Sequence, residues 1–178
     1  TNTAAAAAAL TWLCIDWLHK GKPSVVGACV GAIAGLVAIT PASGFVGPMA
    51  SLVIGFGAGG FCYLAVLLIH KSKRPIDDAL DVLGVHGIGG IWGAIATGIF
   101  ADGAINGADG LLFGNPAQMI PQLIGVGATI GYSFVVTLVI LLILDKTIGL
   151  RVKPAEEKAG LDISVHGEES YEREPRRK

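Results

Sequence analysis

The sequence has 178 residues, of which 52% are hydrophobic and only 15% are charged, and its mean hydropathy is +0.64. This low charge, together with 26 glycines, indicates a polytopic membrane protein, because small residues allow transmembrane helices to pack closely. The formal net charge of −1 selects no class of partner. An open sheet is excluded at membrane depth, and the sequence lacks the alternation of barrel strands, so the spans are predicted to be helices.

Five apolar segments follow one another along the chain. They lie at about residues 1–18, 24–40, 46–69, 82–100 and 117–145. A hydrocarbon core about 30 Å thick requires about 20 helical residues, a length that the third and fifth segments easily reach. The first segment has the composition of a helix interior, so we expect a fragment of a longer chain. The predicted fold class is all-α, a polytopic transmembrane helix bundle of five spans over residues 1–149, followed by a tail over residues 150–178.

Basic residues alternate between successive connections. The 19–24 and 70–78 connections and the segment after residue 145 carry lysine or arginine, whereas the 40–48 and 101–116 connections carry neither. Because cytoplasmic loops of membrane proteins are enriched in Lys and Arg, the basic connections and the tail are predicted to be cytoplasmic. The two connections without basic residues are predicted to be external.

A single histidine, His86, lies in the apolar stretch "DVLGVHGIGGIWGA" of residues 81–94. On a regular helix Val82 lies one turn before it, and the same stripe continues through Gly89, Gly90, Gly93 and Thr97. Such a stripe is typical of a pore lining or of a close helix–helix contact. Ionisable groups inside a membrane usually mark an ion or proton path. The alternatives are a neutral histidine hydrogen-bonded in packing and, less favoured because His19 and His70 lie in predicted loops, a haem ligand.

Acidic residues gather before the 82–100 segment, at Asp77, Asp78 and Asp81. Acids at a helix N-terminus complement the helix dipole and cap free N–H groups, so a structural role is expected. Asp16 lies near the end of the first segment and is expected to pair with a lysine of the 19–24 connection.

The chain has three cysteines, all in apolar segments. Their odd number and unpaired spacing argue against a disulfide framework or a metal cluster. We expect small buried hydrophobic side chains at Cys14, Cys29 and Cys62.

The composition changes after residue 150, where the chain becomes strongly charged. One interpretation is a disordered, solvated tail. The other is a docking segment, because "GLDISVHGEESY" mixes acids with the apolar or aromatic side chains of Leu161, Ile163, Val165 and Tyr171.

Three stretches resemble the ammonium transporter (Amt/Mep/Rh) family, in its prokaryotic Amt branch. They are "GKPSVVGACVGAIAGLVAITPASGFVGP" (21–48), "DDALDVLGVHGIGGIWGAIATGIFA" (77–101) and "GLRVKPAEEKAGLDISVHGEESYE" (149–172). The resemblance implies an eleven-span fold of which this chain is the C-terminal half, the last five spans and the cytoplasmic tail. It also implies a homotrimer with one pore in each subunit.

The resemblance assigns roles to individual residues. His86 matches the second of two pore histidines, and Val82 and Ile33 match apolar residues of the pore lining. Asp78 and Asp81 match acids that shape the cytoplasmic helix ends. The first pore histidine has no counterpart in this sequence. The tail motif implies a regulatory segment that docks a PII-type signalling protein and contains Leu161, Asp162, His166, Gly167, Glu168 and Tyr171.

The expected function is ammonium/ammonia transport across the plasma membrane, with deprotonated substrate passing an intramembrane histidine in a narrow apolar pore. The alternatives are an ammonium sensor that signals through its tail and a membrane scaffold without transport. The expected partners are the substrate, the lipid bilayer, further copies of the chain and the PII-type protein. We expect no enzymatic activity, cofactor, metal or nucleic-acid partner.

Overall fold

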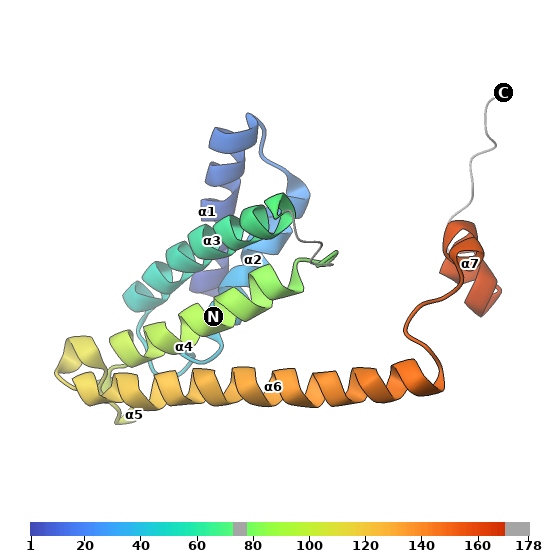
Figure 1. Ribbon diagram of the computed structural model, residues 1–178. Helices are drawn as coiled ribbons and strands as arrows, with labels where there is room; N and C mark the ends of the chain where they lie inside the picture. The colour runs from blue at the N-terminus through green and yellow to red at the C-terminus, as the bar shows by residue number, and fades with distance from the viewer. Residues whose placement is uncertain (73–77, 170–178) are drawn as a thin grey trace. The chain divides into compact units, whose positions relative to one another are not determined.

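The computed structural model describes residues 1–72 and 78–169. Every regular element within these two ranges is helical, and no strand occurs in them. Figure 1 shows α1, α2, α3 and α4 gathered together and α6 as one long helix. The predicted all-α class is therefore confirmed.

Five longer helices follow one another in the described part of the chain. They are α1 (Asn2–Lys20), α2 (Val25–Ile39), α3 (Pro48–Lys71), α4 (Ile88–Phe100) and α6 (Met119–Thr147). The shorter elements are the π-helical turn η1 (Leu83–Gly87), α5 (Gly103–Asn106), the 3₁₀ turns η2 (Leu111–Phe113) and η3 (Pro116–Gln118), α7 (Pro154–Ala159) and a second π-helical turn, η4 (Asp162–His166).

Three helical stretches in the described residues are long and apolar enough to cross a membrane: Pro48–Lys71, Leu83–Phe100 and Pro116–Thr147. The apolar helix Val25–Ile39 is shorter. The division into exactly five spans stays a prediction.

The chain forms two compact units, one over Thr1–Thr129 and one over Ile130–Lys178. The first unit contains α1 to α5 and the start of α6. The second contains the rest of α6 and the described tail elements α7 and η4. The division falls inside α6, and the predicted boundary between bundle and tail at residues 149 and 150 stays a prediction.

The core of the first unit is built from small residues where α1, α2 and α3 meet. Gly35 on α2 and Gly55 on α3 both face the backbone of Ala4 on α1. A methyl group on Gly35 would lie 2.5 Å from the Ala4 carbonyl oxygen, and one on Gly55 would lie closer still. Neither position has room for a side chain, so α1 is in backbone contact with both helices. The buried cluster contains Ala4, Ala8, Ala38, Ile39, Ala42, Ile54, Ala58 and Ala96.

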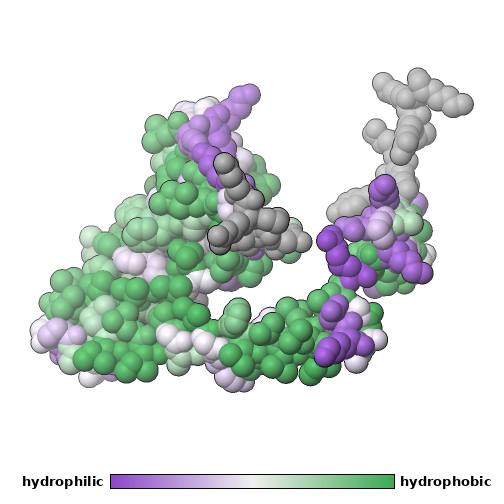
Figure 2. Space-filling model, viewed as in Figure 1, coloured by the Kyte–Doolittle hydropathy of each residue, from purple (hydrophilic) through white to green (hydrophobic). Residues whose placement is uncertain are grey.

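The outer faces of these helices are apolar. Figure 2 shows hydrophobic residues over most of the visible face of the first unit, with hydrophilic residues gathered at one end. Cys62 is buried, but Cys14 and Cys29 are exposed, so the prediction of three buried cysteines is wrong for two of them. They lie on helix faces that point away from the contact between α1, α2 and α3. An outer surface this apolar is typical of contact with lipid or with further helices.

The glycine contacts can be tested with a matched pair on α3. Gly55→Ala is expected to lower the free energy of unfolding by about 1–3 kcal/mol, the usual cost of forcing an extra methyl group into a packed interior. Gly60→Ala brings the same gain in helix propensity, and no described atom lies within 4 Å of its new methyl group, so it should not destabilise. Thermal unfolding of the detergent-purified variants measures both. Equal stability of the two variants would contradict the close contact.

Candidate functional site

His86 lies on the π-helical turn η1, which leads directly into α4. The backbone N–H of Ile88 donates to the carbonyl of Leu83, five residues earlier, and also to that of Val85. Single π turns inside α-helices are rare and occur frequently at functional sites, because the extra residue changes which side chains share a face. Here the turn sets the direction in which His86 points.

Burial differs along the predicted stripe of His86 and the following small residues. Gly89 is buried against Val37 of α2, and Gly93 against Ala38. Thr97 is also buried and donates to the Gly93 carbonyl oxygen. His86, in contrast, is exposed. The glycines thus make the helix contact, while the histidine, on the π turn before them, is exposed.

Ile33 lies beside the same contact on α2. Ala34 and Val85 belong to one buried cluster, which joins α2 to η1. Ile33 precedes Ala34 in the chain and is 43% exposed, and His86 follows Val85. Val82, just before η1, is 53% exposed. The three predicted pore residues therefore flank one helix contact, and none of them is enclosed by the described residues.

Asp78 caps the start of η1. Its carboxylate accepts hydrogen bonds from the backbone N–H of Leu83, at 3.2 and 3.1 Å, and from that of Gly84, at 3.2 Å. Two N–H groups that have no partner within the helix are thereby satisfied, and such a cap contributes about 1 kcal/mol. Asp77 lies outside the described residues.

Asp81 joins the start of η1 to the end of α3. Its backbone has φ 56°, the left-handed conformation, which costs a non-glycine residue of order 1–3 kcal/mol unless its surroundings hold it. Its carboxylate lies 2.8 Å from Nε2 of His70. His70 was placed in a loop by the sequence analysis, as was His19, but the structure puts them in the last turns of α3 and α1.

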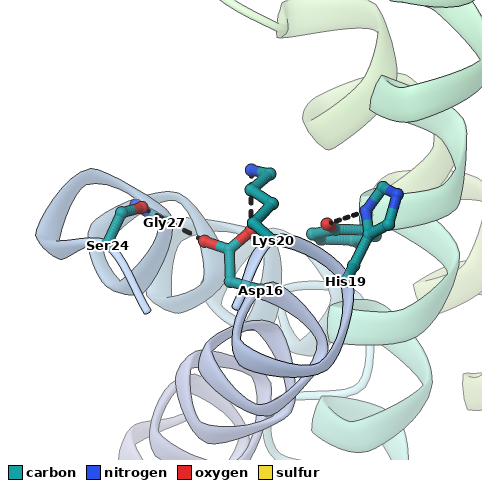
Figure 3. A network of polar contacts seen from close by, with 6 residues as sticks. Asp16, His19, Lys20, Ser24 and Gly27 are labelled. Carbon is teal, nitrogen blue, oxygen red and sulfur yellow. Dashed lines mark hydrogen bonds and ion pairs between the residues drawn. The ribbon is translucent and has the colours of Figure 1, made fainter. Parts of the chain in front are cut away.

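A polar network closes the end of α1 (Figure 3). The buried Asp16 carboxylate pairs with Lys20 Nζ at 2.7 Å and accepts a hydrogen bond from Ser24 Oγ at 3.1 Å. His19 Nδ1 and the Tyr63 hydroxyl lie 2.7 Å apart. The predicted pairing of Asp16 with a lysine of the following connection is confirmed. Sequence reasoning missed Ser24, although a serine directly before an apolar run is a recognisable helix cap.

The tail residues have local structure up to the end of the described range. Gly167 ends η4 in the left-handed conformation, and its N–H donates to Ile163. The Glu168 N–H donates to the Asp162 carbonyl oxygen. Leu161, at the start of η4, is 46% exposed. Tyr171 lies outside the described residues, and His166 is the last residue of η4.

Comparisons with known proteins give the context for this site. The family model described as Ammonium Transporter Family matches residues 1–171. The chain belongs to this family. It is 50% identical over 171 residues to the ammonium transporter Amt1 of Archaeoglobus fulgidus, an alignment that covers 96% of the chain and 43% of that protein. The chain thus spans less than half the length of this relative.

Solved structures agree with the family assignment. The crystal structure of Saccharomyces cerevisiae Mep2 matches with a TM-score of 0.80 and 40% identity, over 86% of the chain and 36% of Mep2. A structure named Sensor Amt Protein matches with a TM-score of 0.78 and 30% identity, over 92% of the chain and 40% of that protein. The family prediction made from the three sequence motifs is confirmed, and the chain is a helical, multi-pass membrane protein.

Proposed function

We propose that the protein conducts ammonium/ammonia across a membrane and that His86, Val82 and Ile33 line the path. The observation that carries the proposal is the exposed histidine on a π turn, flanked by exposed apolar side chains, in a chain of the ammonium transporter family. An ionisable side chain at membrane depth needs a partner or a passing ligand, and the described residues leave His86 accessible to one.

An apolar path favours the neutral form of the substrate. An unpaired charge at mid-bilayer costs at least about 2.5–3.5 kcal/mol on insertion scales and ~10–17 kcal/mol in simulations. For an amine with a lysine-like pKa of about 10.4, losing the proton at pH 7 costs roughly 5 kcal/mol, at 1.36 kcal/mol for each pKa unit. The free-energy cost of deprotonating the substrate is therefore comparable to, or lower than, the cost of moving the charged ion through the path without its hydration water. A potassium ion has no proton to lose, so the same path discriminates against it.

The histidine suits this task because a neutral imidazole offers one hydrogen-bond donor and one acceptor. Ammonia that has left its hydration shell needs both along the path. Val82 and Ile33, being apolar, exclude water beside the imidazole, which strengthens the remaining hydrogen bonds. We thus propose that His86 hydrogen-bonds the ammonia, while Val82 and Ile33 keep this section of the path free of water.

Replacing the histidine tests the path. Vesicles that contain the full-length His86→Ala variant are expected to take up ammonium at least about tenfold more slowly than vesicles with the parent protein, or to lose discrimination against potassium. A tenfold reduction corresponds to a transport barrier that is about 1.4 kcal/mol higher. His19→Ala makes the same chemical change in the α1 network outside the path and should keep uptake per mole of protein near the parent value. If His86→Ala keeps the uptake and selectivity of the parent, His86 does not act in the conduction path and has only a packing role.

We further propose that the protein lies in the plasma membrane with the 19–24 and 70–78 connections and the C-terminus in the cytoplasm. The asymmetry of Lys and Arg between the connections supports this orientation.

Single cysteines introduced at Ser72 and Asn106, in a background without the native cysteines, test the orientation. An impermeant thiol reagent is expected to label position 106 from outside and position 72 only from the cytoplasmic side, because the two connections lie on opposite faces. Labelling of both positions from one side would refute it.

The tail is proposed to regulate transport and, in a homotrimer, to help dock a PII-type signalling protein. The locally folded segment of α7 and η4 supports a defined surface more than a solvated chain, since Ser164 Oγ donates to the Gly160 carbonyl oxygen and Arg151 pairs with Glu157. The proposed regulatory residues are Leu161, Asp162, His166, Gly167, Glu168 and Tyr171.

Removing residues 155–178 is expected to change ammonium uptake or its response to a PII-type protein, because the proposed docking segment is lost, while the trimer remains in the membrane. Uptake in vesicles, with and without the purified partner, measures the effect, and native mass analysis checks the assembly. If uptake and partner binding both stay unchanged, the tail has no regulatory role.

A second candidate function is ammonium sensing, which the likeness to the structure named Sensor Amt Protein favours. A sensor would bind ammonium and respond through its tail with little flux. Counterflow of labelled methylammonium in vesicles separates a transporter from a sensor and from a scaffold without transport. No enzymatic activity is proposed.

A further inference from the structure

One face of α3 supports the segment that carries His86. Cys62, Val66 and His70 are spaced four residues apart, so they lie on one side of the helix. Cys62 Sγ donates to the Val85 carbonyl oxygen at 3.6 Å. A methyl group on Gly84 would lie 2.6 Å from Val66 Cγ2, so the two helices touch there. Residues along α3 thus contact successive positions of the π turn.

The last contact of this face joins His70 Nε2 to the Asp81 carboxylate. Its distance is 2.8 Å, and the side chains are 56% and 23% exposed. Asp81 is the one described non-glycine residue with a positive φ. Its N–H donates to Asp78, and its carbonyl oxygen accepts from Val85 N at 2.8 Å, so it starts the hydrogen-bonding of the turn.

We propose that His70 is a positioning residue for the conduction path. By holding the Asp81 carboxylate, His70 keeps the Asp81 backbone in the left-handed conformation. This conformation sets the direction in which the chain enters Val82 and the π turn that carries His86. Aspartate is among the few residues other than glycine that adopt the left-handed region. Without the contact to His70, the Asp81 backbone is free to return to a negative φ, which would change the orientation of Val82 and the π turn. This inference rests on the proposed function.

The contact of His70 with Asp81 has charged neighbours on both elements that it joins. Lys71 follows His70 on α3 and is exposed, and Asp78 precedes Asp81 with its carboxylate engaged on Leu83 and Gly84. Neither replaces the role of His70. The Asp78 carboxylate is an acceptor and cannot hold another carboxylate, and Lys71 lies one residue along the helix, about 100° around it. Lys71 therefore serves as a matched control at the same helix end.

The test compares three full-length variants with the parent protein, each in its own vesicles: His70→Ala, Asp81→Gly and the double variant. Glycine at position 81 accommodates the positive φ but removes the carboxylate. Each single variant is expected to reduce ammonium uptake per mole of protein roughly twofold to fivefold, the scale of one part-exposed electrostatic contact. The double variant should be no worse than the poorer single variant, because both act through one contact. His70→Gln keeps an N–H donor and should recover most of the uptake, and Lys71→Ala should leave it unchanged.

A spectroscopic readout separates this inference from the proposed function. The ring-nitrogen NMR signals of His86, in protein labelled with ¹⁵N-histidine, are expected to shift in His70→Ala and not in Lys71→Ala. Unchanged uptake together with unchanged His86 signals would overturn the inference, as would single effects that multiply in the double variant. A parent protein without uptake would refute the proposed function, whereas shifted His86 signals would still support the positioning role.

Discussion

The contact of helix backbones at glycine and alanine is the constraint on which the first unit depends. Gly35 and Gly55 admit Ala4 so closely that α1 lies directly against α2 and α3. In a membrane protein the lipid is as apolar as the helix surfaces, so close van der Waals contact rather than the expulsion of water holds the helices together. Many large apolar side chains are consequently exposed, although Ile39 and Ile54 are buried. The polar groups that the described core admits have partners, as Asp16 and Thr97 do.

The same close packing continues along the segment that carries His86. Ala38 leaves no space for a side chain at Gly93, and Cys62 and Val37 leave little at Gly89. His86, on the π turn that precedes them, is exposed. The same segment thus makes a helix contact and presents an ionisable group beside it.

Sequence alone predicted the all-α class and the family, because apolar length and the "DxxGxHGxxG" spacing are local signals. The pairing of Asp16 with a lysine of the 19–24 stretch was also predicted, although the structure places that lysine, Lys20, at the end of α1 rather than in a connection. The π turn was not, because a regular period is the only assumption that a hydropathy pattern supports. The left-handed Asp81 and its pair with His70 depend on how α3 and η1 meet, which no local pattern reports. The exposed Cys14 and Cys29 were misjudged for the same reason, as burial depends on which face a neighbouring helix covers.

The network at the end of α1 has a consequence for how that helix can move against its neighbours. Asp16 is fully buried, yet its charge is balanced by Lys20 one turn later, whose side chain is 57% exposed. The pair has no net charge, and the long stem of lysine keeps its ammonium in an exposed position while the carboxylate stays inside. A shift of α1 along its axis would separate the carboxylate from Ser24 Oγ and from Gly27, which lies directly beside it. The network therefore adds a polar restraint on the position of α1 along its axis to the close contacts of its alanines.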